Sequence, residues 1–161
     1  MALLDGGAHF YDTYQCADGK WISIGAIEPQ FYSLLIEKLE IDDPEFSRQL
    51  DPSAWPTLKQ KLATKFRTKT RDEWCAVMEG TDACFAPVLS LDEARHHPHN
   101  VARNTFIERG GVTQPAPAPR FSRTTAEISM PAPYAGEHNY QALADWGVDR
   151  SALSHPNGTI L

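Results

Sequence analysis

The sequence predicts an α+β fold: a small two-layer domain in which helices cover an antiparallel sheet, followed by an extended arm. Residues 10–15 and 20–26 are extended stretches on either side of an Asp18-Gly19 turn, which is the pattern of a β-hairpin. Apolar residues then recur at helical spacing between residues 31 and 66. The alternating prolines of residues 114–119 exclude a helix and indicate extended chain.

The hairpin leads into the first predicted helix. Ile22, Ile24 and Ala26 alternate with less apolar residues, which predicts one buried face of the strand. Glu28-Pro29 then marks a helix entrance, because the first turn tolerates a proline that lacks an N–H. We expect the apolar residues that follow at helical spacing to face the sheet: Phe31, Leu34, Leu35 and Leu39.

A polar, proline-containing segment at residues 40–53 predicts a loop with a helical turn before a second helix. That helix should bury Trp55, Leu58, Leu62 and Phe66, and hold Lys59, Lys61, Lys65 and Arg67 in solvent. Thr70 and Glu73 have the spacing of a capping box, which predicts a third helix carrying the apolar stripe Trp74, Cys75 and Met78 and ending at Gly80.

The rest of the chain contains shorter elements. Residues 84–89 are strand-like, and Pro87 places them at a sheet edge or a strand end. Ser90 and Glu93 predict a brief helix that Pro98 ends, and residues 105–108 predict a further strand. A small helix is expected at residues 137–146 with Gly147 as its stop, and an irregular end from residue 154 onward.

These patterns divide the chain into a linker (residues 1–9), a small α+β domain (residues 10–110) and a proline-rich arm with a terminal helix (residues 111–161). An extended arm that ends in exposed aromatic residues usually lies on another surface. The residues alone leave three surfaces open: the small domain, a second subunit, or a segment outside this chain.

Composition narrows the class of protein. With 161 residues, 42% hydrophobic and 22% charged, the chain resembles one ordinary globular domain. The formal charge of −6 argues against nucleic acid as a partner. There is no membrane-spanning run and no signal peptide, so we expect a cytoplasmic protein without a membrane partner. Cys16, Cys75 and Cys84 lack CxxC spacing, which favours reduced, partly buried thiols in a reducing compartment.

Most residues with reactive side chains have simpler explanations. His96, His97 and His99 lack the carboxylate or thiol spacing of a metal site, so no metal is expected. Cys75 and Cys84 lack a basic neighbour that would activate a thiolate, and burial explains them better. The other histidines, His9, His138 and His155, are expected at the surface or in loops.

Glu28 stands out because it lies where a strand ends and a helix begins, in the run GAIEPQ at residues 25–30. Backbone N–H groups are free at such junctions, and ligands often bind there. A carboxylate that simply favours the helix dipole is the alternative, and spacing alone prefers this second interpretation.

Several ordered motifs resemble the alpha-methylacyl-CoA racemases of the family III CoA-transferase superfamily. They are LDGGAHFY at residues 4–11, GAIEPQFY at 25–32, DEWC at 72–75, GTDAC at 80–84, PVL at 87–89 and HHPHN at 96–100. The likeness runs from residue 4 to about residue 123 and resumes weakly at residues 136–138. One departure is His9, where the family motif has proline.

The resemblance implies the fold of family III CoA-transferases and a racemase that inverts the alpha carbon of 2-methylacyl-CoA in fatty acid metabolism. It implies an interlocked homodimer whose large N-terminal domain binds CoA and supplies the catalytic Asp and His. This chain would then be the C-terminal portion, inactive without that domain. CoA is part of the substrate, so no separate cofactor is expected.

The resemblance also gives Glu28 a supporting role: it matches the acidic residue that contacts the catalytic histidine. By the same comparison Gly25, Ala26, Ile27 and Gln30 would line the acyl side of the site. Two alternatives stay open. A CoA-transferase should carry a glycine-rich loop at the junction, where this chain has AIEPQ, and a truncated, non-catalytic interaction module would need no site at all.

Overall fold

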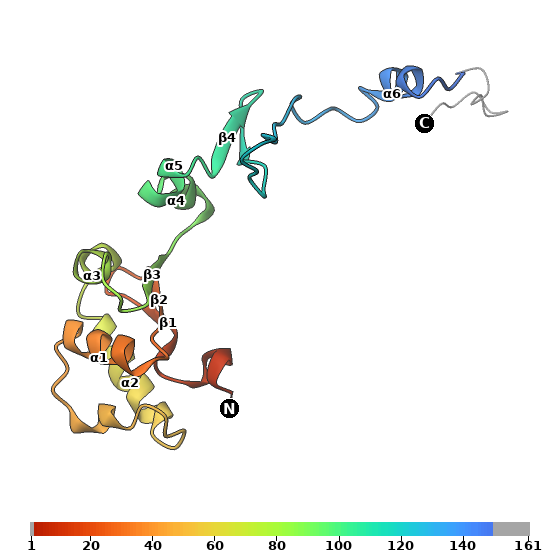
Figure 1. Cartoon of the computed structure of the whole chain (residues 1–161). Helices are drawn as coiled ribbons and strands as arrows, with labels where there is room; N and C mark the ends of the chain where they lie inside the picture. The colour runs from red at the N-terminus through yellow and green to blue at the C-terminus, as the bar shows by residue number, and fades with distance from the viewer. Residues whose placement is uncertain (1, 150–161) are drawn as a thin grey trace. The chain divides into compact units, whose positions relative to one another are not determined.

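The computed structural model describes residues 2–149, and the predicted irregular end and His155 lie outside them. The chain forms two compact units, Met1–Ser90 and Leu91–Leu161, shown in Figure 1. The domain boundary expected at residue 110 falls between two paired strands of the second unit. Residues 1–9, expected as a linker, contain a helical turn at Leu3–Gly7 (η1) and enter the core at Ala8.

The first unit is built on a three-stranded antiparallel sheet in the order β1-β2-β3. Its strands are β1 (Tyr11–Gln15), β2 (Trp21–Gly25) and β3 (Phe85–Val88). The predicted hairpin is confirmed: Tyr14 pairs with Ile22, and Gly19 has the positive φ of 76° that the turn requires. Pro87 lies in the edge strand β3, where its missing N–H interrupts no interior ladder.

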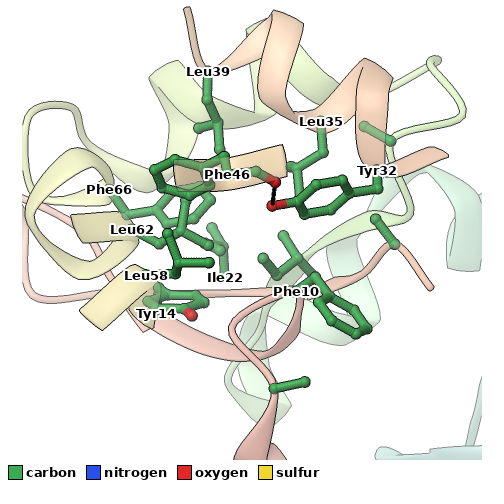
Figure 2. Packing of buried hydrophobic residues seen from close by; sticks show 14 of the residues in the cluster. Phe10, Tyr14, Ile22, Tyr32, Leu35, Leu39, Phe46, Leu58, Leu62 and Phe66 are labelled. Carbon is green, nitrogen blue, oxygen red and sulfur yellow. Dashed lines mark hydrogen bonds between the residues drawn. The ribbon is translucent and has the colours of Figure 1, made fainter. Parts of the chain in front are cut away.

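Three helices cover one face of this sheet: α1 (Pro29–Lys38), α2 (Trp55–Phe66) and α3 (Arg71–Met78). A 3-10 turn, η2 (Pro44–Ser47), lies in the predicted loop between α1 and α2. Figure 2 shows sheet residues and helix residues meeting in one apolar cluster. The predicted inner face of α2 is confirmed by its buried residues, Trp55, Leu58, Leu62 and Phe66.

Aromatic rings link the sheet to α2 and α3. Tyr14 stacks on Phe66 with ring centroids 5.1 Å apart, and Phe66 meets the edge of Trp74 at 5.3 Å. The Trp74 indole N–H donates to the main-chain oxygen of Phe66 at 2.8 Å, so a polar group buried with the ring has a partner. The predicted capping box of Thr70 and Glu73 opens α3.

The predicted inner face of α1 is confirmed in part. Leu35 and Leu39 are buried, and Phe31 and Leu34 pack against the core while only partly buried. Tyr32, which the periodicity did not select, is also buried, and its hydroxyl has a buried hydrogen-bond partner.

Lys59 and Lys61 were expected largely in solvent, but each is half-buried in an ion pair. Lys59 Nζ lies 2.5 Å from Asp12, and Lys61 Nζ lies 2.5 Å from Asp43.

The second unit contains α4 (Leu91–His96), α5 (Pro98–Ala102), the hairpin β4 (Phe106–Arg109) and β5 (Val112–Pro115), and α6 (Asn139–Asp145). The strand predicted at residues 105–108 corresponds to β4. Pro98 separates the two short helices and also opens the second of them, with His97 as its N-cap. No residue between 91 and 149 is buried, so the described part of this unit has no core of its own.

Large apolar side chains of the second unit are instead exposed, among them Phe121, Tyr134 and Trp146. Exposed apolar groups at this density are typical of a segment that packs on another surface. Within residues 2–149, no helix combines the length and the apolar character needed to cross a membrane.

Leu62→Ala should lower the free energy of unfolding by about 2–5 kcal/mol, because the deletion leaves a cavity beneath α2. Urea denaturation of the purified chain measures the change. Gln60→Ala, on the exposed face of the same helix, should change it by less than about 0.5 kcal/mol. Equal effects of the two substitutions would contradict the observed orientation of α2.

Candidate functional site

The strand-to-helix junction of β2 and α1 holds Glu28 at the N-cap of α1, with extended backbone angles of φ −72° and ψ 142°. Its side chain makes no capping hydrogen bond. The residue is exposed, and its carboxylate has no hydrogen bond or ion pair within residues 2–149. The fold therefore presents this carboxylate to solvent, where a group outside the described chain can reach it.

The other residues predicted for the site differ in exposure. Gly25 ends β2 and Ile27 follows it, both half-buried, whereas Gln30 in the first turn of α1 is exposed. Ala26 is fully buried, and its N–H donates to the Phe10 carbonyl at 3.1 Å. Ala26 thus supports the junction from inside the core, while Gly25, Ile27 and Gln30 remain at least partly exposed to solvent.

A shallow groove of about 420 Å³ begins beside this junction and runs over the face of the sheet that the helices leave open. Small residues line it, including Gly25, Ser23 and Ala86. Cys84 also lines the groove, and partial desolvation together with the negative charges of Glu28 and Asp82 raises the pKa of its thiol.

The cysteines are free thiols and none has the environment of a nucleophile. Burial is the main cause that raises the pKa of Cys16 to about 11 and that of Cys75 to about 11. Cys84, expected to be partly buried, is exposed, because it precedes β3 with its backbone in the left-handed region at φ 51°. All three thiols are protonated near neutral pH, which disfavours thiolate chemistry.

The histidine group of residues 96–99 lies on α4 and α5 in the second unit. In the part of the chain that the structure describes, no three His, Cys, Asp or Glu side chains gather as a metal would require.

His9 lies in the turn before β1, in agreement with the expectation of a surface or loop position, but its ring is fully buried. The rings of Phe10, Tyr32 and Phe46 surround it in edge-on contacts with centroids 5.2–5.9 Å away. Its Nε2 lies 2.8 Å from the Tyr32 hydroxyl, which itself donates to the Phe46 carbonyl at 2.9 Å (Figure 2 shows the second bond). Tyr32 and Phe46 come from distant segments, so these two contacts could not be foreseen from the local sequence.

These bonds fix the tautomer of His9. The Tyr32 hydroxyl has one proton and gives it to Phe46, so His9 Nε2 must be the donor in the bond between the two side chains. Nδ1 is then an unprotonated, buried nitrogen without a hydrogen-bond partner among the described residues. Burial lowers the pKa of His9 to about 4, which keeps the ring neutral near pH 7.

Gln49 is a second buried polar residue that the sequence did not single out. Its side-chain amide donates to the carbonyls of Ala26 at 3.2 Å and Ile27 at 2.8 Å, the two residues before Glu28. The Trp55 indole N–H donates to the main-chain oxygen of Gln49 at 2.7 Å. The loop between α1 and α2 therefore supports the junction from below.

The sequence of this chain is similar to proteins of one known family. The sequence model of CoA-transferase family III matches residues 3–139. Alpha-methylacyl-CoA racemase of Mus musculus is 45% identical over 94% of this chain and 40% of that protein. The racemase of Homo sapiens is 44% identical over 96% of this chain and 41% of that protein. The chain therefore spans about 40% of the length of these relatives.

Among solved structures, a CAIB/BAIF family protein from Brucella suis superposes with a TM-score of 0.70. The match covers 90% of this chain and 39% of that one, at 20% sequence identity. At this identity the likeness shows a shared fold of helices and small antiparallel sheets, as expected from the sequence.

Acid should destabilise the fold through His9. The unfolded chain takes up a proton near pH 6.5 and the native state only near pH 4, so the stability from neutral His9 is complete above about pH 6.5 and declines as the pH falls to about 4. The full loss is about 3 kcal/mol. Urea denaturation across this range should show it in the wild type, not in His9→Leu. His99→Gln, at an exposed position, should behave as the wild type does.

Proposed function

Because the chain belongs to CoA-transferase family III, we propose that it supplies the Glu28-bearing part of a racemase that inverts the alpha carbon of 2-methylacyl-CoA thioesters. The observation that carries this proposal is an exposed carboxylate that has no partner among residues 2–149 and is set at a strand-to-helix junction that does not use it as a cap. The similarity to alpha-methylacyl-CoA racemases supports the choice of reaction.

The chemistry needs two proton-transfer groups on opposite faces of the alpha carbon. A base removes the alpha proton, and the C–H electron pair moves into the enolate of the thioester. Hydrogen-bond donors stabilise the enolate oxygen, and an acid returns a proton to the other face. The substrate is neither oxidised nor reduced, so the reaction requires no redox cofactor.

We infer that the acid and base lie in a large N-terminal domain outside this chain. Glu28 then acts on the histidine of that pair: its carboxylate accepts a hydrogen bond from the imidazole, orients the ring and favours its charged form. Gly25, Ile27 and Gln30 flank Glu28 and line the acyl side of the substrate, while buried Ala26 backs them. Coenzyme A would be held by the large domain, since this chain has no phosphate loop.

The second unit supports the need for that domain. Residues 91–149 bury none of their side chains, and a segment of this kind gains stability only when its apolar groups are covered. We propose that the arm packs on the large domain of an interlocked homodimer, acting on acyl-CoA esters of fatty acid metabolism in the cytoplasm.

The junction favours racemisation over CoA transfer. A transferase would approach the CoA thioester with a glycine-rich loop at this position, whereas residues 26–30 are Ala-Ile-Glu-Pro-Gln. Only Gly25 provides a position without a side chain at the junction, and a Cβ there would meet the Tyr11 ring at 3.5 Å. This chain has Glu28 at the position where a transferase would need a flexible, glycine-rich loop.

The purified chain should not exchange the alpha proton of a 2-methylacyl-CoA with deuterium, because it lacks the paired acid and base. Addition of the part of the mouse racemase that this chain does not match should restore exchange. Proton NMR in deuterated buffer measures both reactions. Rapid exchange by the chain alone would overturn the assignment of the main catalytic groups to another domain.

In the reconstituted enzyme, Glu28→Gln should slow exchange by about 10²-fold, since the histidine loses the group that orients it. Glu37→Gln is the matched control: it makes the same change on an exposed position of the same helix, and it should retain the wild-type rate. A wild-type rate for Glu28→Gln would return this residue to a role in helix stability.

Amide hydrogen exchange should locate the covered arm. In the chain alone, amides of residues 116–138 should exchange rapidly because few of them are bonded within secondary structure. After the large domain is added, they should be protected at least about 10-fold. The amides of β1 and β2 provide the internal control, and an arm that stays unprotected would contradict the proposed packing.

A further inference from the structure

A series of hydrogen bonds, joined through the loop between α1 and α2, connects His9 to the backbone beneath Glu28. Its last step is the side-chain amide of Gln49, which donates to the carbonyls of Ala26 and Ile27 at 3.2 and 2.8 Å. These two peptide groups set the direction in which the chain enters α1. A buried side chain from the loop after α1 therefore holds the backbone immediately before Glu28, together with the bond from the Ala26 N–H to the Phe10 carbonyl.

Two buried hydrogen bonds hold the loop that carries Gln49, in addition to the ion pairs of Lys61 with Asp43 and Glu45. The Tyr32 hydroxyl of α1 donates to the carbonyl of Phe46 at 2.9 Å, and the Trp55 indole of α2 donates to the carbonyl of Gln49 at 2.7 Å. Both donors are buried, so loss of either bond leaves polar groups without water. The loop can move away from the junction only by breaking these bonds.

His9 and Phe46 both bind the Tyr32 hydroxyl. The Phe46 carbonyl can only accept, so the phenol proton goes to it, and the phenol oxygen receives the Nε2–H of His9 at 2.8 Å. The Tyr14 hydroxyl fixes the position of His9 by donating to its carbonyl at 2.7 Å. The bonds thus run from β1 through His9, Tyr32 and the loop to the junction.

We propose that His9, Tyr32 and Gln49 are positioning residues that form a relay beneath the junction, fix the direction of Glu28, and do so only while His9 is neutral. The relay itself is a property of the fold, and its meaning for catalysis rests on the proposed function. Protonation of Nδ1 would create a buried N–H that has no acceptor among residues 2–149, and the relay would open to solvate it.

His9 is the member of the relay that titrates in acid. The titratable groups facing it are the phenols of Tyr32 from α1 and Tyr14 from β1, and burial raises the pKa of both. Asp12 is the charged group that acts on Tyr14, and burial is the cause of the lowered pKa of His9. The amide of Gln49 does not ionise, so His9 is the relay residue that takes up a proton in acid. Asp43 and Glu45, which pair with Lys61, are the carboxylates on the loop that carries Gln49.

The direct test measures the junction in the chain alone. Gln49→Leu and Tyr32→Phe should each raise amide exchange at Ile27 by about 10-fold relative to the β1–β2 amides, the effect expected for loss of one buried hydrogen bond. Leu62→Ala is the control for general destabilisation, because it weakens the core away from the junction and should raise all protected amides alike. Equal profiles for the three variants would overturn the relay.

The second test separates His9 from general acid effects. His9→Gln can still donate to Tyr32 through its amide but cannot become charged. In the wild type, the relative exchange at Ile27 should rise as the pH falls from about 6.5 to about 4, and in His9→Gln it should stay flat. An identical pH profile in both proteins would overturn the requirement for neutral His9.

Kinetics of the reconstituted enzyme distinguish the relay from the proposed function. Gln49→Leu should lower kcat for alpha-proton exchange by about 10-fold with little change in KM, since Glu28 is present but less well directed. Faster amide exchange at Ile27 in Gln49→Leu, combined with a wild-type rate in Glu28→Gln, would support the relay and overturn the proposed role of Glu28. Unchanged amide exchange at Ile27 in Gln49→Leu, combined with a slow Glu28→Gln enzyme, would overturn the relay and support the proposed role of Glu28.

Discussion

The burial of one face of the β1–β2 hairpin underlies the rest of the first unit. Tyr14, Ile22 and Ile24 point to the same side of the sheet, and helices α1, α2 and α3 cover them. This burial is the largest favourable contribution available to a domain of this size. It also sends β2 out of the sheet at Gly25 with its next residue, Ala26, inside the core, so the position of the chain at Glu28 follows from the packing of the sheet.

Covering the sheet also encloses polar groups, which the fold satisfies with side chains from distant segments. His9, Tyr32 and Gln49 come from the entry into β1, from α1 and from the following loop. His9 binds Tyr32, Tyr32 binds the loop at Phe46, and Gln49 of that loop binds the backbone of Ala26 and Ile27. In a water-free core, each donor must find an acceptor, so these bonds constrain the backbone more tightly than apolar contacts do. The stability of the core and the direction of Glu28 are consequently linked.

The second unit differs from the first in that it has no buried core among its described residues. Its hairpin β4–β5 and its short helices form locally, yet none of residues 91–149 becomes buried. Short elements of this kind gain little from propensity alone and depend on packing for their stability. The first unit thus folds around its own core, whereas the second exposes apolar side chains such as Phe121 and Trp146 to solvent.

The sequence by itself determined the elements whose signals are local. The hairpin with its Asp18-Gly19 turn, the inner face of α2 and the capping box of α3 each depend on residues within a few positions of one another, and all three are found in the structure. It also placed Glu28 at a strand-to-helix junction, while the role of that residue came from resemblance. Only the tertiary structure decided that Tyr32 is buried more deeply than Phe31, that His9 is buried and that Gln49 binds the junction. Those outcomes depend on partners 14 to 23 residues apart in sequence, which no local periodicity encodes.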